Sequence, residues 1–180
     1  MSMNERDFKM LLRQAQRGET AAVLAAVDVD PALLLRFNED GVRLLHWACY
    51  GGHLEMATGL LDRGSHLHAR TLRGSDALCL ASGQGHLQVA TLLLNRGADP
   101  CTRADSWTAI GLAAARGHRP VVKLLLSRGA NLAAAMKGSR PIATSTSMIA
   151  VTDADVVRGI THRNLLWASS TWGRALLPSP

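Results

Sequence analysis

The chain has 180 residues, a formal net charge of +6 and a pI of about 10.0, and its length suits one domain or about four to five stacked repeats. Apolar residues make up 47% but aromatic residues only 4%, so a core built mainly from Ala and Leu favours helix-on-helix packing. No apolar run reaches roughly 18 residues, so we expect no membrane span. The charged residues 1–10 lack the apolar segment of a signal peptide.

The cysteines and the absent motifs argue against catalysis. Cys49, Cys79 and Cys101 are odd in number and form no Cys-x-x-Cys pair, so we expect free thiols in the reducing cytoplasm or nucleus. The chain has no phosphate-binding glycine loop, no nucleophile elbow and no His-Glu-x-x-His motif. We therefore predict no catalytic residue, no cofactor and no metal ion.

The first predicted unit covers residues 4–37 and contains two helices. The earlier helix is indicated by the spacing Leu11-Leu12-x-x-Ala15-x-x-Gly18, and the later one covers 21–27. We expect residues 28–31 to break the later helix, because proline cannot continue a helix and restricts the residue before it. One side of the earlier helix is strongly polar, as expected for a terminal unit that lacks a neighbour there.

The next unit, residues 38–70, has the clearest pattern. It reads Leu45-His46-x-Ala48-Cys49-x-x-Gly52-His53, followed by Leu60-Leu61-x-x-Gly64. The pattern predicts helices over 44–51 and 54–62 with a tight turn between them.

The same pattern returns twice. Residues 71–102 predict helices over 77–83 and 87–95, and residues 103–135 predict helices over 109–116 and 119–127. Gly52, Gly85 and Gly117 are 33 and 32 residues apart, so the period is close to 33 residues.

A period of this length with this pattern resembles the ankyrin repeat family. The resemblance covers about residues 8–142 and is strongest over 38–131. It implies an all-α solenoid of stacked helix–turn–helix units with loop or hairpin connections. Most ankyrin repeats open the first helix with Thr-Pro-Leu-His, whereas here the corresponding first residues are Arg43, Asp76 and Thr108. Asp76 and Thr108 can cap a helix and Arg43 cannot. We expect the fourth repeat to be less stable than the second.

The domain boundaries follow from this frame. We expect an ankyrin repeat domain over 4–142, with repeats at about 4–37, 38–70, 71–102 and 103–135 and a partial fifth at 136–160. Residues 161–180 are expected to form a frayed or disordered tail. The alternative is that Trp167 or Trp172 in this tail caps the last repeat.

Two recurring side chains have structural interpretations. His53, His86 and His118 recur at the repeat period, too far apart in the stack to share a metal ion, so we interpret them as turn residues. Arg63, Arg96 and Arg128 occur just before a glycine, where a positive charge favours the end of a helix. The alternative for the arginines is a strip that binds an acidic ligand.

The resemblance implies a binding surface, because the loop tips and the outward side of each first helix line a concave face in ankyrin arrays. The matching positions predict these partner-binding residues: Glu39, Asp40, Val42, Trp47, Tyr50, Leu72, Arg73, Leu80, Asp105, Trp107 and Leu112. Trp47, Leu80 and Leu112 share one position of the repeat, and Trp is enriched at binding hot spots. The alternative is that this column packs between neighbouring helices.

The function implied by the resemblance is non-enzymatic binding of an unidentified protein by a monomeric adaptor, inhibitor or assembly factor. One alternative is a binder of nucleic acid or another acidic polymer, suggested by the charge of +6. The basic residues are scattered, which argues against nucleic acid. The other alternative is a fragment of a larger enzyme, suggested by the loss of the repeat pattern after Gly129.

Overall fold

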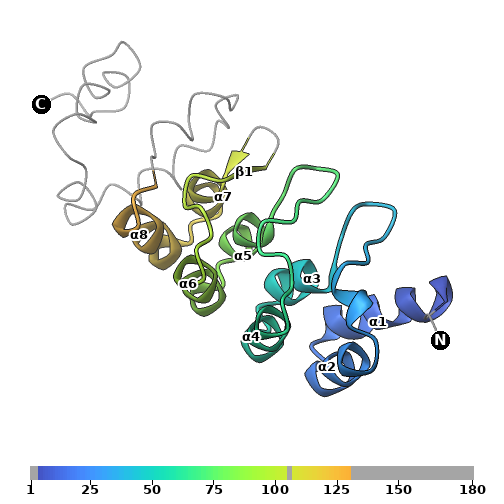
Figure 1. Ribbon diagram of the computed structural model, residues 1–180. Helices are drawn as coiled ribbons and strands as arrows, with labels where there is room; N and C mark the ends of the chain where they lie inside the picture. The colour runs from blue at the N-terminus through green and yellow to red at the C-terminus, as the bar shows by residue number, and fades with distance from the viewer. Residues whose placement is uncertain (1–3, 105–106, 131–180) are drawn as a thin grey trace, which may run out of the picture.

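The computed structural model describes residues 4–104 and 107–130, and these form four pairs of helices that stack side by side (Figure 1). The elements in chain order are α1 (Glu5–Arg17), α2 (Thr20–Val29), the 3₁₀ helix η1 (Pro31–Leu34), α3 (Leu44–Gly51), α4 (Leu54–Asp62), α5 (Ala77–Gln84), α6 (Leu87–Asn95), β1 (Arg103–Ala104), β2 (Trp107–Thr108), α7 (Ala109–Ala115) and α8 (Arg119–Ser127). The predicted fifth repeat and tail lie outside the described residues.

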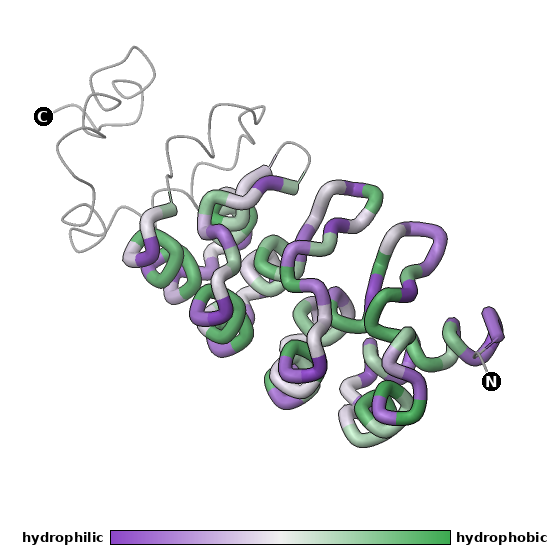
Figure 2. The backbone as a smooth tube through the Cα atoms, in the orientation of Figure 1, coloured by the Kyte–Doolittle hydropathy of each residue, from purple (hydrophilic) through white to green (hydrophobic). Residues whose placement is uncertain are grey.

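The helices form two rows. Helices α1, α3, α5 and α7 contact one another in an inner row, and α2, α4, α6 and α8 form the outer row. Apolar side chains between the rows make one continuous core, from Phe8 in the first repeat to Leu125 in the fourth. Figure 2 shows hydrophilic stretches mainly in the connecting loops and turns, while the helices carry most of the hydrophobic ones. The fold is the predicted stack of helix pairs, with one short antiparallel strand pair, β1–β2, in the last hairpin.

Most predicted helix bounds agree with the structure to within one residue, and α2 is the exception. We expected the helix to break at Asp28, but α2 continues to Val29. Proline restricts only the residue before it, so Asp30 alone leaves the helical conformation, with φ −132° and ψ 89°. The side chain of Asp30 then accepts a hydrogen bond from the backbone N–H of Ala32, which starts η1 at Pro31.

The recurring histidines link each repeat to the one before it. The ring N–H of His53 donates to the Gln16 carbonyl at 3.2 Å, and His86 and His118 donate in the same way to Tyr50 at 2.9 Å and Gly83 at 3.1 Å. The structural interpretation of these residues is therefore correct. Their hydrogen bonds to the preceding repeat were not predicted.

The recurring arginines join successive outer helices. Arg63 makes two hydrogen bonds to the Asp28 carboxylate, at 2.6 and 3.0 Å. Arg96 reaches Asp62 at 2.7 Å, and Arg128 reaches the side-chain oxygen of Asn95 at 2.9 Å. Each arginine is also the C-cap residue of its helix, in line with the structural interpretation stated above.

The hairpin loops that precede the inner helices also contact one another. The backbone N–H of Leu72 donates to the Asp40 carbonyl at 2.8 Å. A Cβ at Gly41 would lie 2.9 Å from Leu72 N, so glycine permits this close approach. One repeat further on, the Arg70 guanidinium donates to the Arg103 carbonyl at 2.8 Å. The hairpins thus form a continuous edge beside the inner helices.

Among the residues described, no helix is both long and apolar enough to cross a membrane.

Candidate partner-binding face

The predicted binding residues lie on the hairpins and inner helices, and we call this side of the stack the inner face. The exposed members are Glu39, Asp40, Tyr50, Leu72 and Arg73. The half-buried members are Val42, Trp47, Leu80, Trp107 and Leu112. Asp105 falls outside the described residues.

Trp47 occupies both of the positions that the sequence analysis weighed. It packs against the core, as does Leu112 in the corresponding position of the fourth repeat, yet neither side chain is fully buried. The Trp47 ring meets the Tyr50 ring edge to face, with centroids 5.8 Å apart and planes at 87°. Tyr50 itself is 43% exposed. The second repeat thus presents an aromatic pair whose orientation is set by packing from behind.

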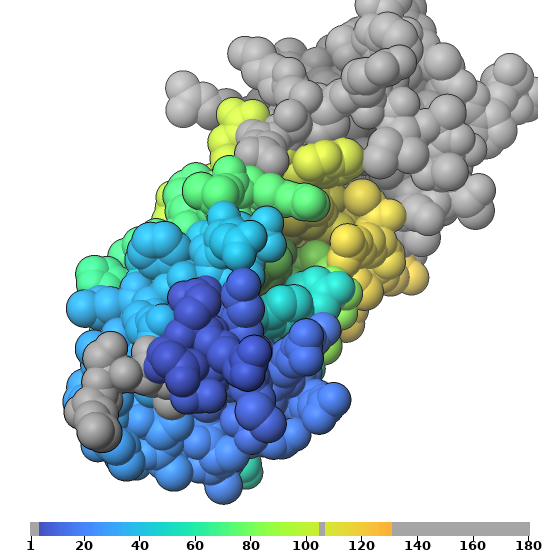
Figure 3. Space-filling view, turned by 90° about the vertical axis from the view of Figure 1, so that its right-hand side faces the viewer, coloured from blue at the N-terminus to red at the C-terminus, as the bar shows by residue number. Residues whose placement is uncertain are grey.

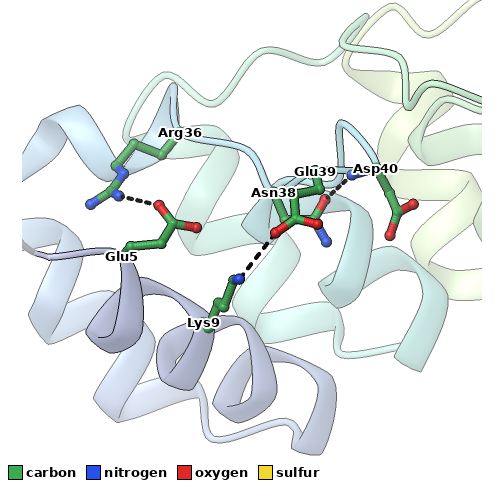
Figure 4. A network of polar contacts seen from close by, with 6 residues as sticks. All are labelled: Glu5, Lys9, Arg36, Asn38, Glu39 and Asp40. Carbon is green, nitrogen blue, oxygen red and sulfur yellow. Dashed lines mark hydrogen bonds and ion pairs between the residues drawn. The ribbon is translucent and has the colours of Figure 1, made fainter.

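The turn of the second hairpin is held by one side chain. The side-chain oxygen of Asn38 accepts hydrogen bonds from the backbone N–H groups of Asp40 at 3.1 Å and Val42 at 2.8 Å. The Asn38 backbone N–H donates to the Val42 carbonyl at 3.1 Å. This clamp determines where Glu39 and Asp40 project from the turn (Figure 4). Asn38 was not among the predicted residues, although the side chain of an asparagine at the start of a turn commonly bonds the backbone a few residues further on.

An ion pair joins this turn to the first helix. Lys9 Nζ lies 3.1 Å from Glu39 Oε1, and nearby Arg36 lies 3.5 Å from Glu5 Oε2 (Figure 4). Both pairs are solvent-exposed, so each adds little to stability. They link α1, which forms one wall of the inner face at its N-terminal end, to the segment that enters the turn.

A shallow depression of about 340 Å³ opens between α1 and the turn. It is lined by Lys9, Leu12, Arg13, Gln16, Asn38, Glu39, Asp40 and Trp47. Three of these were predicted from the repeat frame, namely Glu39, Asp40 and Trp47. Figure 3 views the stack from this end, with α1 in dark blue in front and the later repeats receding towards yellow.

The lining residues of α1 were missed because the first repeat was interpreted only as a polar cap. Their spacing did contain a signal. Lys9, Arg13 and Gln16 are four and three residues apart, which places them on one side of a helix. Because α1 contacts α3, this side of α1 borders Trp47.

The titratable groups of the inner row are not arranged for nucleophilic chemistry. Burial raises the pKa of the Cys49 and Cys79 thiols well above their usual range, and the Asp76 carboxylate raises both further. Burial also lowers the pKa of His46, whose ring accepts from Arg43 N at 3.1 Å and donates to the Ala69 carbonyl at 2.9 Å. Across the part of the chain that the structure describes, no three His, Cys, Asp or Glu side chains gather closely enough to hold a metal ion.

Comparison with known families agrees with this architecture. The family model for ankyrin repeats matches three copies over residues 45–136, which is half of the chain. No curated protein matches the chain in sequence. Ankyrin repeats generally serve as protein–protein interaction modules and are typical of non-catalytic binding proteins. The matched residues and the stacked helix pairs show that this chain belongs to the ankyrin repeat family.

Proposed function

We propose that this chain is a non-enzymatic binding module that takes a partner protein on its inner face. The observation that carries the proposal is a series of incompletely buried apolar side chains on the inner helices and hairpins of three successive repeats. The series consists of Trp47, Tyr50, Leu80, Trp107 and Leu112. Stacking brings residues 32 or 33 positions apart into neighbouring units, so these side chains border one surface.

The apolar series and the charged residues beside it are expected to contribute differently to binding. Burying apolar surface contributes about 25 cal/mol per Å², less the cost of association. Aromatic residues at the centre of an interface often dominate affinity, and Trp47 with Tyr50 provides such a centre. The exposed charges of Asp40 and Arg73 would mainly set orientation and the association rate.

The experiment begins by capturing a partner from the native cell with the wild-type chain. The dissociation constant for that isolated partner is then measured for wild type, Trp47→Ala and Trp107→Ala. We expect Trp47→Ala to weaken binding by about 2 kcal/mol, roughly 30-fold, as truncation of a hot spot does. The matched control is Leu87→Ala, because Leu87 is 40% exposed on the outer helix α6.

Folding must be checked by circular dichroism in every variant, because Trp47 also packs against the core. Unchanged affinity in folded Trp47→Ala and Trp107→Ala would contradict the proposal. A loss of affinity in Leu87→Ala equal to that in Trp47→Ala would instead place the site on the outer helices.

A second candidate function, binding of an acidic polymer, is favoured by the charge of the fourth repeat. Its basic residues are Arg103, Arg116, Arg119, Lys123 and Arg128. No acidic residue occurs among residues 107–130 of the described chain. A binder of this kind shows log affinity that falls steeply with log salt concentration. Binding of a single-stranded oligonucleotide with such a slope, lost on Lys123→Ala, would favour this candidate.

A further inference from the structure

The N-terminal end of the inner face has a mixed charge. The depression described above is lined by two basic residues, Lys9 and Arg13, and two acidic residues, Glu39 and Asp40. Its formal charge is therefore zero, in contrast to the basic fourth repeat. A nucleic acid gains affinity by pairing many phosphates with Lys and Arg, so a neutral lining does not fit a polyanion.

Two of the four charged side chains already pair with each other. Lys9 and Glu39 form the ion pair that joins α1 to the turn. The side chains of Arg13 and Asp40 make no hydrogen bond or ion pair with any other residue that the structure describes. One basic and one acidic group thus remain available at the depression, Arg13 on the α1 wall and Asp40 on the wall formed by the turn.

The backbone of Asp40 is held by two hydrogen bonds. Asp40 N–H donates to Asn38 at 3.1 Å, and the Asp40 carbonyl accepts from Leu72 at 2.8 Å. With both backbone groups held, the side chain leaves the turn in a restricted direction. Figure 4 shows the carboxylate turned away from the Lys9–Glu39 pair. Such preorganisation lowers the entropic cost of pairing with a ligand.

Trp47 lines the same depression and supplies its aromatic surface. An aromatic ring attracts a cation placed over its face, and Trp is the best of the rings for this. The edge-to-face contact with Tyr50 holds the Trp47 ring. The charged end of a Lys or Arg side chain that pairs with Asp40 can therefore also lie over the ring of Trp47.

We propose that this end of the inner face recognises a peptide segment with one basic and one acidic side chain. The basic side chain pairs with Asp40 and packs on Trp47, and the acidic side chain pairs with Arg13. The inference rests on the proposed function and deepens it by naming the chemistry of the partner. The charge pairing selects the orientation of the segment, because reversing it brings like charges together.

The test uses a library of short random peptides displayed on phage and selected on the full chain. We expect the enriched peptides to carry a Lys or Arg and an Asp or Glu on either side of an apolar residue. A synthetic copy of one such peptide should bind Asp40→Asn about three- to tenfold more weakly than wild type at low salt. Glu55→Gln is the matched control, because Glu55 is an exposed acid on the outer helix α4.

A charge exchange separates recognition from folding. Asp40→Lys should reject the selected peptide and should bind a copy whose basic residue is replaced by Glu. This rescue depends on contact with the peptide and is not expected from a structural role of Asp40.

The outcomes distinguish the inference from the proposed function. Peptides that need Trp47 but show no preference for charge would overturn the inference and leave the proposed function standing. A selection in which no peptide loses affinity on Trp47→Ala, Leu80→Ala or Leu112→Ala would overturn both. Displacement of the selected peptide by an oligonucleotide, with Asp40→Asn improving the oligonucleotide's affinity, would overturn the inference in favour of a polyanion.

Discussion

In the second repeat a histidine ring holds the start of the inner helix, and the two later repeats have smaller groups at the same position. His46 bonds both Arg43 N and the Ala69 carbonyl, the latter at 2.9 Å. Cys79, at the same position of the third repeat, brings its sulfur only to 3.9 Å from the Thr102 carbonyl. Gly111 takes this position in the fourth repeat and has no side chain. At this one position of the repeat, the side-chain bond to the following loop is therefore weaker in the third repeat and missing in the fourth.

The outer helices show the same trend. The Arg63–Asp28 contact has two charged hydrogen bonds, Arg96–Asp62 has one, and Arg128 meets the neutral Asn95. The arginine contacts between successive outer helices thus become weaker from the first interface to the last. The aromatic pair of the inner face lies on the second repeat, where these contacts are the most complete. We expect the second repeat to be the most stable part of the binding face against local unfolding and the fourth repeat to be the least stable.

Glycine substitutions in the third and fourth repeats should show the largest difference in stability between repeats. Gly85 has φ +82°, and a Cβ there would lie 2.5 Å from the His118 ring. Gly117 has φ +77° and no described atom within 4 Å of such a Cβ. Valine at either position is strained by about 1–3 kcal/mol. We expect Gly85→Val to cost at least about 1 kcal/mol more, because His118 must move and lose its bond to Gly83.

Urea denaturation of the two glycine variants measures the difference in unfolding free energy. Equal losses for Gly85→Val and Gly117→Val would show that the histidine contact between repeats has no energetic role.

Helix caps should give the next largest difference. The buried Asp76 accepts from Cys79 N at 2.9 Å and also from the Thr102 hydroxyl, so it joins two loops. Among the residues described, the Thr108 side chain accepts only from Gly111 N, at 3.1 Å. We expect Asp76→Ala to cost about 2 kcal/mol and Thr108→Ala about 1 kcal/mol. Thermal melting checks this order, and a larger loss from Thr108→Ala would reverse the ranking of the repeats.

The contribution of His46 should depend on pH. Burial lowers the pKa of His46 below its ordinary value of 6.5, because the folded state favours the neutral ring. Between the folded pKa and 6.5 the unfolded chain binds more protons, so stability falls as pH falls through this window. The stability difference between wild type and His46→Gln should therefore be larger at about pH 7.5 than at pH 5. A difference that grows on acidification would mean that the ring is charged in the folded protein.

The smallest expected effect concerns the outer arginines. The hydrogen bond from Arg63 lowers the pKa of Asp28, which reports a charged pair at the surface. Salt near about 1 M shortens the screening length to roughly 3 Å, so the destabilisation by Arg63→Ala should shrink there. Arg128→Ala should show no such salt dependence, because Asn95 is neutral. Identical salt responses in the two variants would remove the distinction between these interfaces.

Much of the fold could be predicted because the repeat period is visible in the spacing of recurring residues along the sequence. The spacing of Gly52, Gly85 and Gly117 located each turn between helices, and the helix bounds followed within a residue or so. The end of α2 was mispredicted, because the effect of Pro31 was extended to Asp28. The pairing of Arg63 with Asp28 was not predicted, since the repeat frame does not show which side chains meet across an interface.

Only those residues of the candidate site that occupy recurring positions of the repeat could be predicted from the sequence. Trp47, Leu80 and Leu112 share a position of the frame, and the structure places them on the same row of helices. Lys9 and Arg13 lie in the divergent first repeat, where no later copy indicates their role. Their place beside Trp47 depends on how α1 packs against α3, which is information about tertiary structure.

The central claim is that one partner spans the inner face of several repeats, and side-chain footprinting of the complex tests it most directly. Hydroxyl radicals oxidise exposed aromatic side chains and, more slowly, exposed aliphatic ones, and the rate at each residue is compared with and without the captured partner. We predict that Trp47, Tyr50 and Trp107 are all protected, while Leu87 on α6 and Val29 on α2 react as in the free chain. Protection of Leu87 or Val29 with unchanged rates at Trp47, Tyr50 and Trp107 would contradict the claim and place the partner on the outer helices.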